Sequence, residues 1–345
     1  MTEQDWIRGP IEAEFSFLVY CDFQSPPCAE LYTSMQALRE LRPDEIQLIY
    51  RQFPLLVLND KAGWAAELAL AADAQGAFWS MHDLLYDQQD LWTELSATDF
   101  LAWAEEAART LDLDAAQIAT ELQEGVYSKA VEEAYVQGVN SGLPGTPFLL
   151  LNGEWFRASP TLINLEAAIR LELLASRQYS QPPEFEIVRD AVYIAHIQLN
   201  TGDVEIQLFP DSAPDSVANF IFLANNGWFD DTIFYRIVPG SFIEGGDPSG
   251  TGFGGPGYFL PDEIDPTLEF NRVGRLVMMG SGPDTIGSRF AITLRSVPEW
   301  QGSRPIIGQV IEGLPLLADL EAREPLEDLL KDPNVRIIEV AIEEQ

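Results

Sequence analysis

Apolar positions in the first half of the chain form short β-prone runs separated by long helical stretches. Residues 15–20 and 46–53 are rich in aromatic and aliphatic side chains, which favours strands. Residues 62–125 carry apolar side chains at helical spacing and contain few helix breakers. A third apolar run, 148–151, is followed by an Asn-Gly turn and by a helical pattern near 160–176. This order predicts an α/β domain with a helical insertion.

The second half changes to a β-rich pattern. Residues 192–199 and 204–209 alternate apolar and polar positions around a turn-forming Asn-Thr-Gly-Asp, which predicts a hairpin. A helical pattern covers 215–225, and Asp211 and Ser212 are suited to cap its start. Strand-like runs with glycine-rich links follow, so we expect a mainly-β domain.

A proline-containing stretch, 179–188, separates the two patterns. Its paired prolines, Pro182 and Pro183, restrict the backbone and mark a stiff connector. A chain of 345 residues also exceeds one ordinary core. We therefore expect a first domain over 1–178 and a second over 189–345.

The composition is that of a globular protein with an extreme negative charge. Hydrophobic residues make up 46% and charged residues 22% of the chain, and the formal net charge is −35. Each half carries about half of that charge, so it forms a solvated surface rather than an acidic tail. Such a surface repels nucleic acid and anionic membranes, and no apolar run reaches the roughly 18 residues that span a bilayer. We expect neither nucleic-acid binding nor membrane insertion.

The segment Ser25-Pro26-Pro27-Cys28 opens a helical pattern in the first half. Together with residues 76–83 (GAFWSMHD) and the loop Gly145-Thr146-Pro147, it resembles the DsbA-like thioredoxin fold with its helical insertion. The resemblance implies a cis-proline at Pro147 beside the active site. It also implies a Cys-x-x-Cys redox site with a nucleophilic leading cysteine. Ser25 occupies that position here, and a hydroxyl cannot replace a thiolate in disulfide exchange.

Cys21 and Cys28, the two cysteines of the chain, leave three interpretations open. They form a structural disulfide between a strand end and a helix start, a widely spaced redox couple, or a reduced pair. We favour the disulfide, which on the chain-entropy model stabilises a loop of this length by about 2.5 kcal/mol. A disulfide fits an extracytoplasmic compartment, whether secreted, periplasmic or at the cell surface. The fold would then bind an extended peptide near Pro147.

The two histidines, His82 and His196, each stand alone in their segments. Two histidines and two cysteines provide no zinc-type spacing. We therefore expect packed or surface histidines, no metal site and no cofactor.

Glycine-rich motifs mark the second half. The run Phe234-Tyr235-Arg236-Ile237-Val238-Pro239-Gly240 is followed by Gly245-Gly246-Asp247 and a glycine-rich loop, and residues 278–290 read MMGSGPDTIGSRF. With residues 213–220 (APDSVANF), these segments resemble the cyclophilins, the prolyl cis/trans isomerases. The resemblance implies a closed antiparallel barrel of eight strands with capping helices, which binds proline-containing peptides.

The resemblance implies that Arg236 is the catalytic residue. Rotation about the prolyl amide faces a barrier of roughly 18–20 kcal/mol, because the nitrogen lone pair is conjugated with the carbonyl group. A guanidinium that donates to this nitrogen localises the lone pair and favours the twisted state. No acid/base pair, metal or cofactor is needed. Without the surrounding motif, an ion pair of Arg236 with Glu244 or Asp247 would be the simpler expectation.

Further positions carried over from the family are expected to bind the peptide. They are Phe242, Glu244, Met279, Gly280, Arg289, Phe290, Trp300 and Arg304. Several positions depart from the family pattern. Glu244 and Arg289 stand where the family has glutamines, Gly280 where it has an asparagine and Arg304 where it has a histidine. Ala291 stands where the family has a phenylalanine at the bottom of the proline pocket. Arg289 and Arg304 are equally compatible with solvated charges at the rim and with contacts to an acidic peptide.

These residues favour a peptidyl-prolyl isomerase and folding helper for unfolded protein clients, with activity weakened by the departures. A non-catalytic peptide-binding or assembly module is the alternative, because both sites are altered. A thiol-disulfide oxidoreductase that uses Cys21 and Cys28 is the second alternative.

Overall fold

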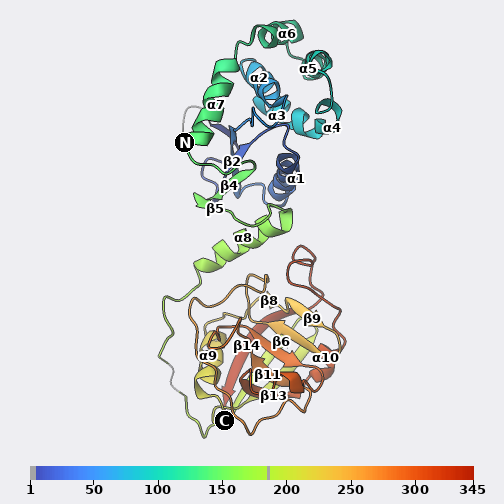
Figure 1. Ribbon diagram of the computed structural model, residues 1–345. Helices are drawn as coiled ribbons and strands as arrows, with labels where there is room; N and C mark the ends of the chain where they lie inside the picture. The colour runs from blue at the N-terminus through green and yellow to red at the C-terminus, as the bar shows by residue number, and fades with distance from the viewer. Residues whose placement is uncertain (1–4, 185–186) are drawn as a thin grey trace. The chain divides into compact units, whose positions relative to one another are not determined.

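The computed structural model describes residues 5–184 and 187–345. The chain divides into two compact units, Met1–Leu165 and Glu166–Gln345 (Figure 1). The division falls inside helix α8 (Leu162–Ala175), ahead of the stretch in which the sequence places the linker. Leu174 belongs to the core of the second unit, and the Tyr179 N–H donates to the Pro256 carbonyl at 2.8 Å. The end of α8 and the residues after it therefore fold with that unit.

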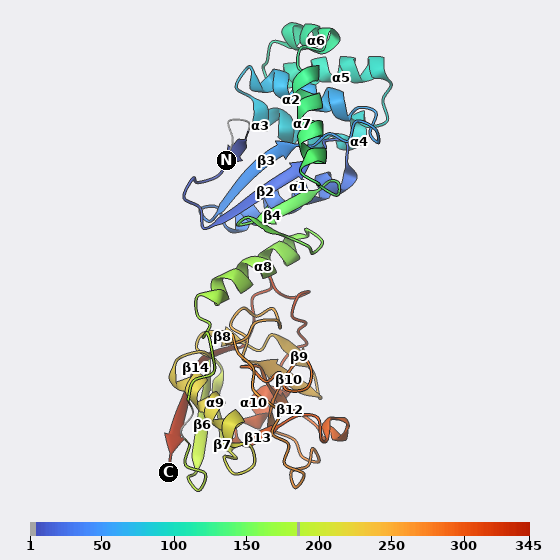
Figure 2. The same ribbon diagram turned by 60° about the vertical axis from the view of Figure 1, so that its left-hand side comes forward.

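The first unit is built on a five-stranded sheet (Figure 2). The strands pair in the order β1-β3-β2-β4-β5, with β2 and β3 parallel and the other neighbours antiparallel. Their bounds are β1 Trp6–Arg8, β2 Phe15–Cys21, β3 Ile46–Gln52, β4 Phe148–Leu151 and β5 Glu154–Trp155. Alternate side chains of β2 are buried, which is the pattern of a strand with one face against the core.

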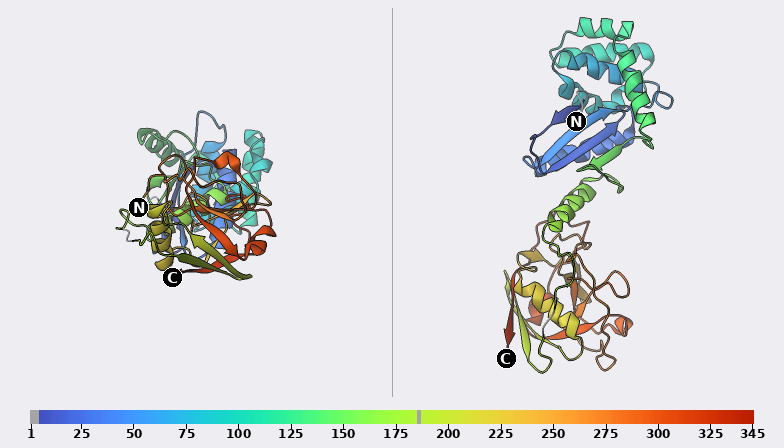
Figure 3. Two further views of the ribbon diagram at one scale, coloured as in Figure 1. Left: turned by 90° about the horizontal axis from the view of Figure 1, so that it is seen from below. Right: turned by 90° about the vertical axis from the view of Figure 1, so that its left-hand side faces the viewer.

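Helices fill the connections of this sheet. Helix α1 (Pro26–Leu41) starts directly after β2 with proline in its first turn, where the missing N–H costs no hydrogen bond. The insertion between β3 and β4 holds helices that gather in one cluster (Figure 3). They are α2 Ala62–Asp73, α3 Phe78–Asp87, α4 Gln89–Trp92, α5 Ala97–Thr110, α6 Ala115–Glu124 and α7 Ser128–Asn140. The predicted α/β domain with a helical insertion is confirmed.

The turn between β4 and β5 follows from its sequence. Asn152 and Gly153 both adopt positive φ angles, 49° and 86°. This pair of angles is the one that a two-residue hairpin turn requires, and Asn-Gly adopts it most readily. The predicted turn is confirmed.

The second unit is built on a nine-stranded antiparallel sheet. The strands pair in the order β8-β14-β6-β7-β13-β11-β12-β10-β9. Their bounds are β6 Tyr193–Leu199, β7 Gly202–Leu208, β8 Thr232–Ile233, β9 Arg236–Val238, β10 Phe242–Gly245, β11 Arg275–Met278, β12 Phe290–Thr293, β13 Ile306–Glu312 and β14 Arg336–Glu344. The predicted hairpin is β6–β7, with Leu199 paired to Gly202.

The strand count differs from the eight-stranded closed barrel that the resemblance implied. Residues 232–238 form two short strands, β8 and β9, which pair with β14 and β10 respectively. Phe234 and Tyr235 separate them, so one β-prone run supplies both ends of the strand order. No ladder joins β8 to β9 within residues 5–184 and 187–345.

Helix α9 (Pro214–Asn225) is capped by a residue far along the chain. Its N-cap is Ala213, and neither Asp211 nor Ser212 caps it as expected. The Glu263 carboxylate instead accepts from the N–H groups of Asp215 and Ser216, at 3.1 and 2.7 Å. A distant carboxylate therefore satisfies the first free N–H groups of this helix.

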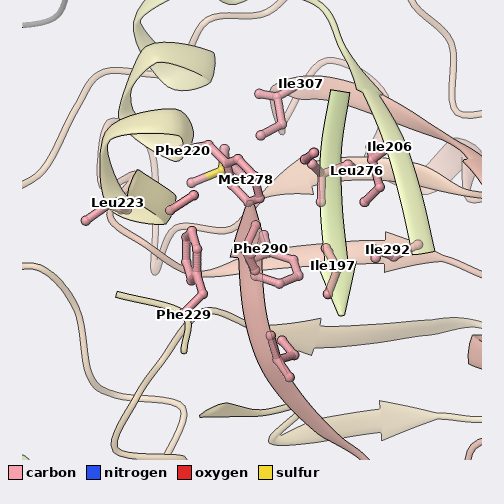
Figure 4. Packing of buried hydrophobic residues seen from close by; sticks show 14 of the residues in the cluster. Ile197, Ile206, Phe220, Leu223, Phe229, Leu276, Met278, Phe290, Ile292 and Ile307 are labelled. Atoms are coloured by element: carbon pink, nitrogen blue, oxygen red, sulfur yellow. The ribbon is translucent and has the colours of Figure 1, made fainter. Parts of the chain in front are cut away.

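The core of the second unit lies between α9 and the curled sheet. Phe220 of α9 lies beside Met278 of the sheet (Figure 4) and meets the Phe290 ring edge-on, and all three side chains are buried. A short helix, α10 (Leu314–Ala318), and a long connection to β14 complete the unit. This packing makes the sheet a rigid support for the side chains on its other face.

Candidate active site

The β9–β10 hairpin brings the candidate catalytic residue to a fixed place. Pro239 and Gly240 form its turn, where Gly240 has a φ of 67° and the Ser241 N–H donates to the Val238 carbonyl at 2.9 Å. The register pairs Arg236 with Glu244. Side chains on paired residues lie on the same face of a sheet, so this pairing places the two charges together.

Arg236 contacts two carboxylates and one aromatic ring. Its Nη1 lies 3.5 Å from Glu244 Oε1, and its Nε lies 3.6 Å from Glu324 Oε2. The guanidinium carbon is 5.4 Å from the centre of the Phe242 ring. The side chain is 40% exposed, and Nε has no hydrogen-bond partner among the residues that the structure describes. Arg236 is therefore held in place by charge, and the exposed part of its side chain can contact a ligand.

Glu244 is buried beneath this arginine. The Tyr235 hydroxyl donates to its Oε2 at 3.3 Å. Burial raises the pKa of the Glu244 carboxyl, although Arg236, Tyr235, Arg289 and Arg304 all act to lower it. The same burial raises the pKa of Tyr235, and the Glu244 charge adds to this rise. The site thus has a carboxylate whose charge is costly in the folded state.

Aromatic side chains extend the site from Arg236 toward Arg304. The ring centres of Phe242 and Trp300 are 5.1 Å apart, and Trp300 also meets Phe270 edge-on at 6.0 Å. The Arg304 guanidinium lies 5.0 Å from the centre of the Trp300 ring. Burial lowers the pKa of Arg304. Arg236, Phe242, Trp300 and Arg304 therefore form a connected row of contacts.

Hydrogen bonds of Met279 and Arg289 connect the end of β11, the glycine-rich loop and the segment before β12. The Met279 N–H donates to the Arg289 carbonyl at 2.9 Å. The Arg289 guanidinium donates to the Gly252 carbonyl at 2.7 Å and to the Ser281 hydroxyl at 2.6 Å. A Cβ on Gly280 would lie only 2.7 Å from Thr285 Oγ1, so a side chain there would require Thr285 or the loop to shift.

Phe290 differs from the other predicted peptide-binding residues. Its ring is fully buried and meets Phe220, Phe229 and Phe234 in the core (Figure 4). Successive side chains of a strand point to opposite faces, so Phe290 faces away from the Arg289 side of β12. Its place is beneath the site, where it supports the sheet and does not line the surface.

Two family models match the chain, and each matches a different part of it. Residues 194–342 match the model described as cyclophilin type peptidyl-prolyl cis-trans isomerase/CLD, and residues 1–170 match the model described as thioredoxin. Peptidyl-prolyl cis-trans isomerase A of Mycobacterium tuberculosis is 39% identical over 137 residues, which cover 35% of this chain and 75% of the relative. The chain belongs to the cyclophilin-type peptidyl-prolyl cis-trans isomerase family.

Other relatives match the same cyclophilin half. Peptidyl-prolyl cis-trans isomerase CYP18-1 of Arabidopsis thaliana is 42% identical over 128 residues, covering 36% of this chain and 80% of the relative. Peptidyl-prolyl cis-trans isomerase-like 2 of Rhizopus delemar is 41% identical over 131 residues, and the match covers 37% of this chain but only 25% of that protein. A solved cyclophilin-type isomerase of Cryptosporidium parvum is 33% identical, with a TM-score of 0.40, covering 44% of this chain and 98% of its own.

Glu324 lies beside Arg236 in the candidate site, and the sequence did not reveal it. It lies far along the chain from Arg236, in the connection between α10 and β14. A pair of backbone hydrogen bonds between Ile237 and Arg323 brings this connection alongside β9. No spacing rule predicts such a contact, because it depends on long-range pairing.

The thioredoxin-like unit holds its two cysteines in a disulfide. Cys21 and Cys28 are bonded and both buried. Ser25 stands at the N-cap of α1. The peptide bond between Thr146 and Pro147 is cis. The disulfide joins the end of β2 to the first turn of α1.

The two histidines contact neighbouring carboxylates. His82 is buried among aromatic rings, and its Nδ1 is 2.9 Å from Asp83. His196 lies between Glu205 and Glu343 at the surface. Within the described parts of the chain, no group of three or more His, Cys, Asp or Glu residues is arranged to hold a metal ion. No helix in those parts is long and apolar enough to cross a membrane.

Proposed function

We propose that the cyclophilin domain isomerises X-Pro bonds in extended or unfolded protein clients, with Arg236 as the catalytic residue. The supporting observation is a partly exposed guanidinium fixed beside an aromatic surface on a rigid sheet. Isomerisation needs a donor to the prolyl nitrogen and an apolar seat for the ring. It needs no proton transfer, so a site without an acid/base pair can perform it.

In this mechanism each side chain has a separate task. Arg236 donates to the prolyl nitrogen and stabilises the twisted amide more than either planar form. Phe242 and Trp300 offer the apolar surface against which the ring rests. Met279 and Arg289 form the rim on the side of the glycine-rich loop. Ala291, where the family has a phenylalanine, leaves the floor of the proline pocket wider.

The departures support a weakened activity. Arg236 already faces Glu244 and Glu324, and both carboxylates offset the positive charge that it presents to the prolyl nitrogen. Gly280 supplies no side chain, and the smaller Ala291 removes apolar contact with the ring. We expect a rate enhancement below that of a cyclophilin with the family residues at these positions.

Exchange spectroscopy on short X-Pro peptides tests the proposal. The full chain should accelerate cis/trans exchange, and Arg236→Ala should reduce the acceleration by about 100-fold, the usual cost of one transition-state donor. Arg236→Lys should recover little, since an ammonium lacks the planar array of donors. Undiminished acceleration in both variants would disprove the role of Arg236.

A non-catalytic module for proline-containing peptides is the second candidate. The two carboxylates at Arg236 favour it, because a neutralised guanidinium can still anchor a peptide without driving rotation. Peptide-induced chemical-shift changes without any acceleration of exchange would support this candidate over the enzyme.

For the first unit we propose a DsbA-like domain that has lost its redox nucleophile and binds an extended polypeptide near Pro147. Ser25 cannot form a thiolate, and the Cys21–Cys28 disulfide is buried, which supports a structural bond. The disulfide also supports an extracytoplasmic location. An insulin-reduction assay tests the oxidoreductase alternative, which would require turnover that Cys28→Ala abolishes.

A further inference from the structure

We propose that Glu324 selects peptides with a cationic side chain next to the proline, which makes it a specificity-determining residue. This inference rests on the proposed isomerase site. The Glu324 side chain is 50% exposed, and its Oε2 lies 3.6 Å from Arg236 Nε. The exposed part of this carboxylate is therefore open to a charged group on a bound peptide.

The sheet topology fixes the side on which Glu324 stands. Strand β9 pairs with β10 along one edge and with residue 323 along the other. Glu244 and Phe242 lie on β10, so Glu324 approaches Arg236 from the opposite side of β9. We therefore expect a proline ring resting on Phe242 to leave Glu324 uncovered, and a residue that flanks the proline in an extended peptide to meet it.

The backbone around Glu324 is anchored on both sides. Ile237 and Arg323 exchange two hydrogen bonds, at 2.9 and 3.1 Å, and the Glu324 N–H donates to Asp328 Oδ2 at 2.8 Å. The next residue, Pro325, lies 3.4 Å from where a Cβ on Gly252 would stand. A fixed backbone holds the base of the Glu324 side chain beside β9, so that less of the chain has to be ordered when a ligand binds.

The Glu324 carboxylate can accept a donor from a cationic partner in addition to facing Arg236. The Arg236 contact is longer than a hydrogen bond, so it leaves the carboxylate oxygens of Glu324 able to accept another donor. The net charge of −35 also attracts cationic segments toward the protein at low salt. If Glu324 instead served only to hold Arg236, its removal would change the rate for every peptide by the same factor.

A charge series of peptides separates these roles. Peptides that differ only in Lys, Gln or Glu beside the proline, placed before it in one set and after it in another, are compared by exchange rate and by binding titration. The proteins are the native chain, Glu324→Gln, Glu324→Lys and the control Glu327→Gln. Glu327 is an exposed carboxylate on the same segment.

We expect the native chain to prefer Lys over Glu by about fivefold in one of the two sets, as for a partly exposed ion pair. Glu324→Gln should abolish the preference, Glu324→Lys should reverse it, and Glu327→Gln should preserve it. High salt should reduce it. An unchanged Lys/Glu ratio in Glu324→Gln, or an equal change for all peptides, would overturn the inference. If no peptide is isomerised, the proposed activity fails, and the binding ratios alone decide the role of Glu324.

Discussion

Glu244 shows how one residue changes the charge of the candidate site. It places a carboxylate where the cyclophilin pattern has a glutamine, and the fold buries it next to Tyr235 and Arg236. The raised pKa means that the folded protein binds the Glu244 proton more tightly than the unfolded chain does. The ionised form therefore costs stability, even with arginines nearby.

Replacing this carboxyl should stabilise the protein at neutral pH. The contribution of Glu244 to stability is complete below the unfolded-state pKa of about 4.3 and is lost as pH rises through the higher folded-state pKa. Glu244→Gln keeps the uncharged shape, so its free energy of unfolding should increasingly exceed that of the native chain as pH rises. Denaturant titrations from pH 4 to pH 8 measure the difference, with the exposed Glu339→Gln as a parallel control. A pH-independent difference for Glu244→Gln would refute the account.

At the scale of elements, the glycine-rich loop depends on one buried carboxylate. Asp247 accepts hydrogen bonds from the N–H groups of Ser249, Gly252 and Gly254, and from the hydroxyls of Ser249 and Thr251. A Cβ on Gly254 would lie within 2.0 Å of this carboxylate, so glycine is required there. The loop in turn offers the Gly252 carbonyl to Arg289.

Removing that carboxylate should destabilise the cyclophilin unit and disturb the rim of the site. We expect Asp247→Ala to cost about 3 kcal/mol or more, since it leaves several buried donors unsatisfied. Urea unfolding followed by the tryptophan fluorescence of this unit provides the measurement. A cost under about 0.5 kcal/mol, the range of surface substitutions, would contradict the assigned role.

The disulfide joins two elements of the first unit and should act on that unit alone. Cys28→Ala opens the link between β2 and α1, and the chain-entropy model gives a loss of about 2.5 kcal/mol for a loop of this length. Peptide isomerisation should be unaffected, because the proposed site lies wholly in the second unit. Parallel assays of unfolding and exchange check both statements. A lost exchange activity in a folded variant would show that the first unit contributes to catalysis.

Sequence reasoning succeeded where the elements are local. The β6–β7 hairpin and the Asn152-Gly153 turn depend on neighbouring residues, and the structure has both. Arg236 and Phe242 meet because one short turn joins their strands. Glu263 at α9 and Glu324 at β9 are contacts between distant segments, which no local pattern encodes. The direction of the Phe290 side chain could have been inferred from the sequence. Successive side chains of a strand point to opposite faces, so an outward Arg289 implies an inward Phe290.

At the scale of the whole molecule, the dominant quantity is the charge of −35. Like charges on a compact surface repel one another and destabilise the folded state. We expect the free energy of unfolding at pH 7 to rise with added NaCl, because the Debye length falls from about 30 Å at 0.01 M to about 10 Å at 0.1 M. The same titration near the sequence pI of about 4.1 is the control, where the effect should largely vanish. Salt-independent stability at pH 7 would contradict a destabilising repulsion among these charges.

The isomerase assignment depends most directly on Arg236, and one comparison tests it. Cis/trans exchange of an X-Pro peptide is measured with the native chain, with Arg236→Ala and with Arg109→Ala. Arg109 is a matched control, since it is an exposed arginine that pairs with two carboxylates, Glu105 and Glu106, in the first unit. We predict acceleration by the native chain and by Arg109→Ala, and its loss in Arg236→Ala. Equal acceleration by all three proteins would contradict the account.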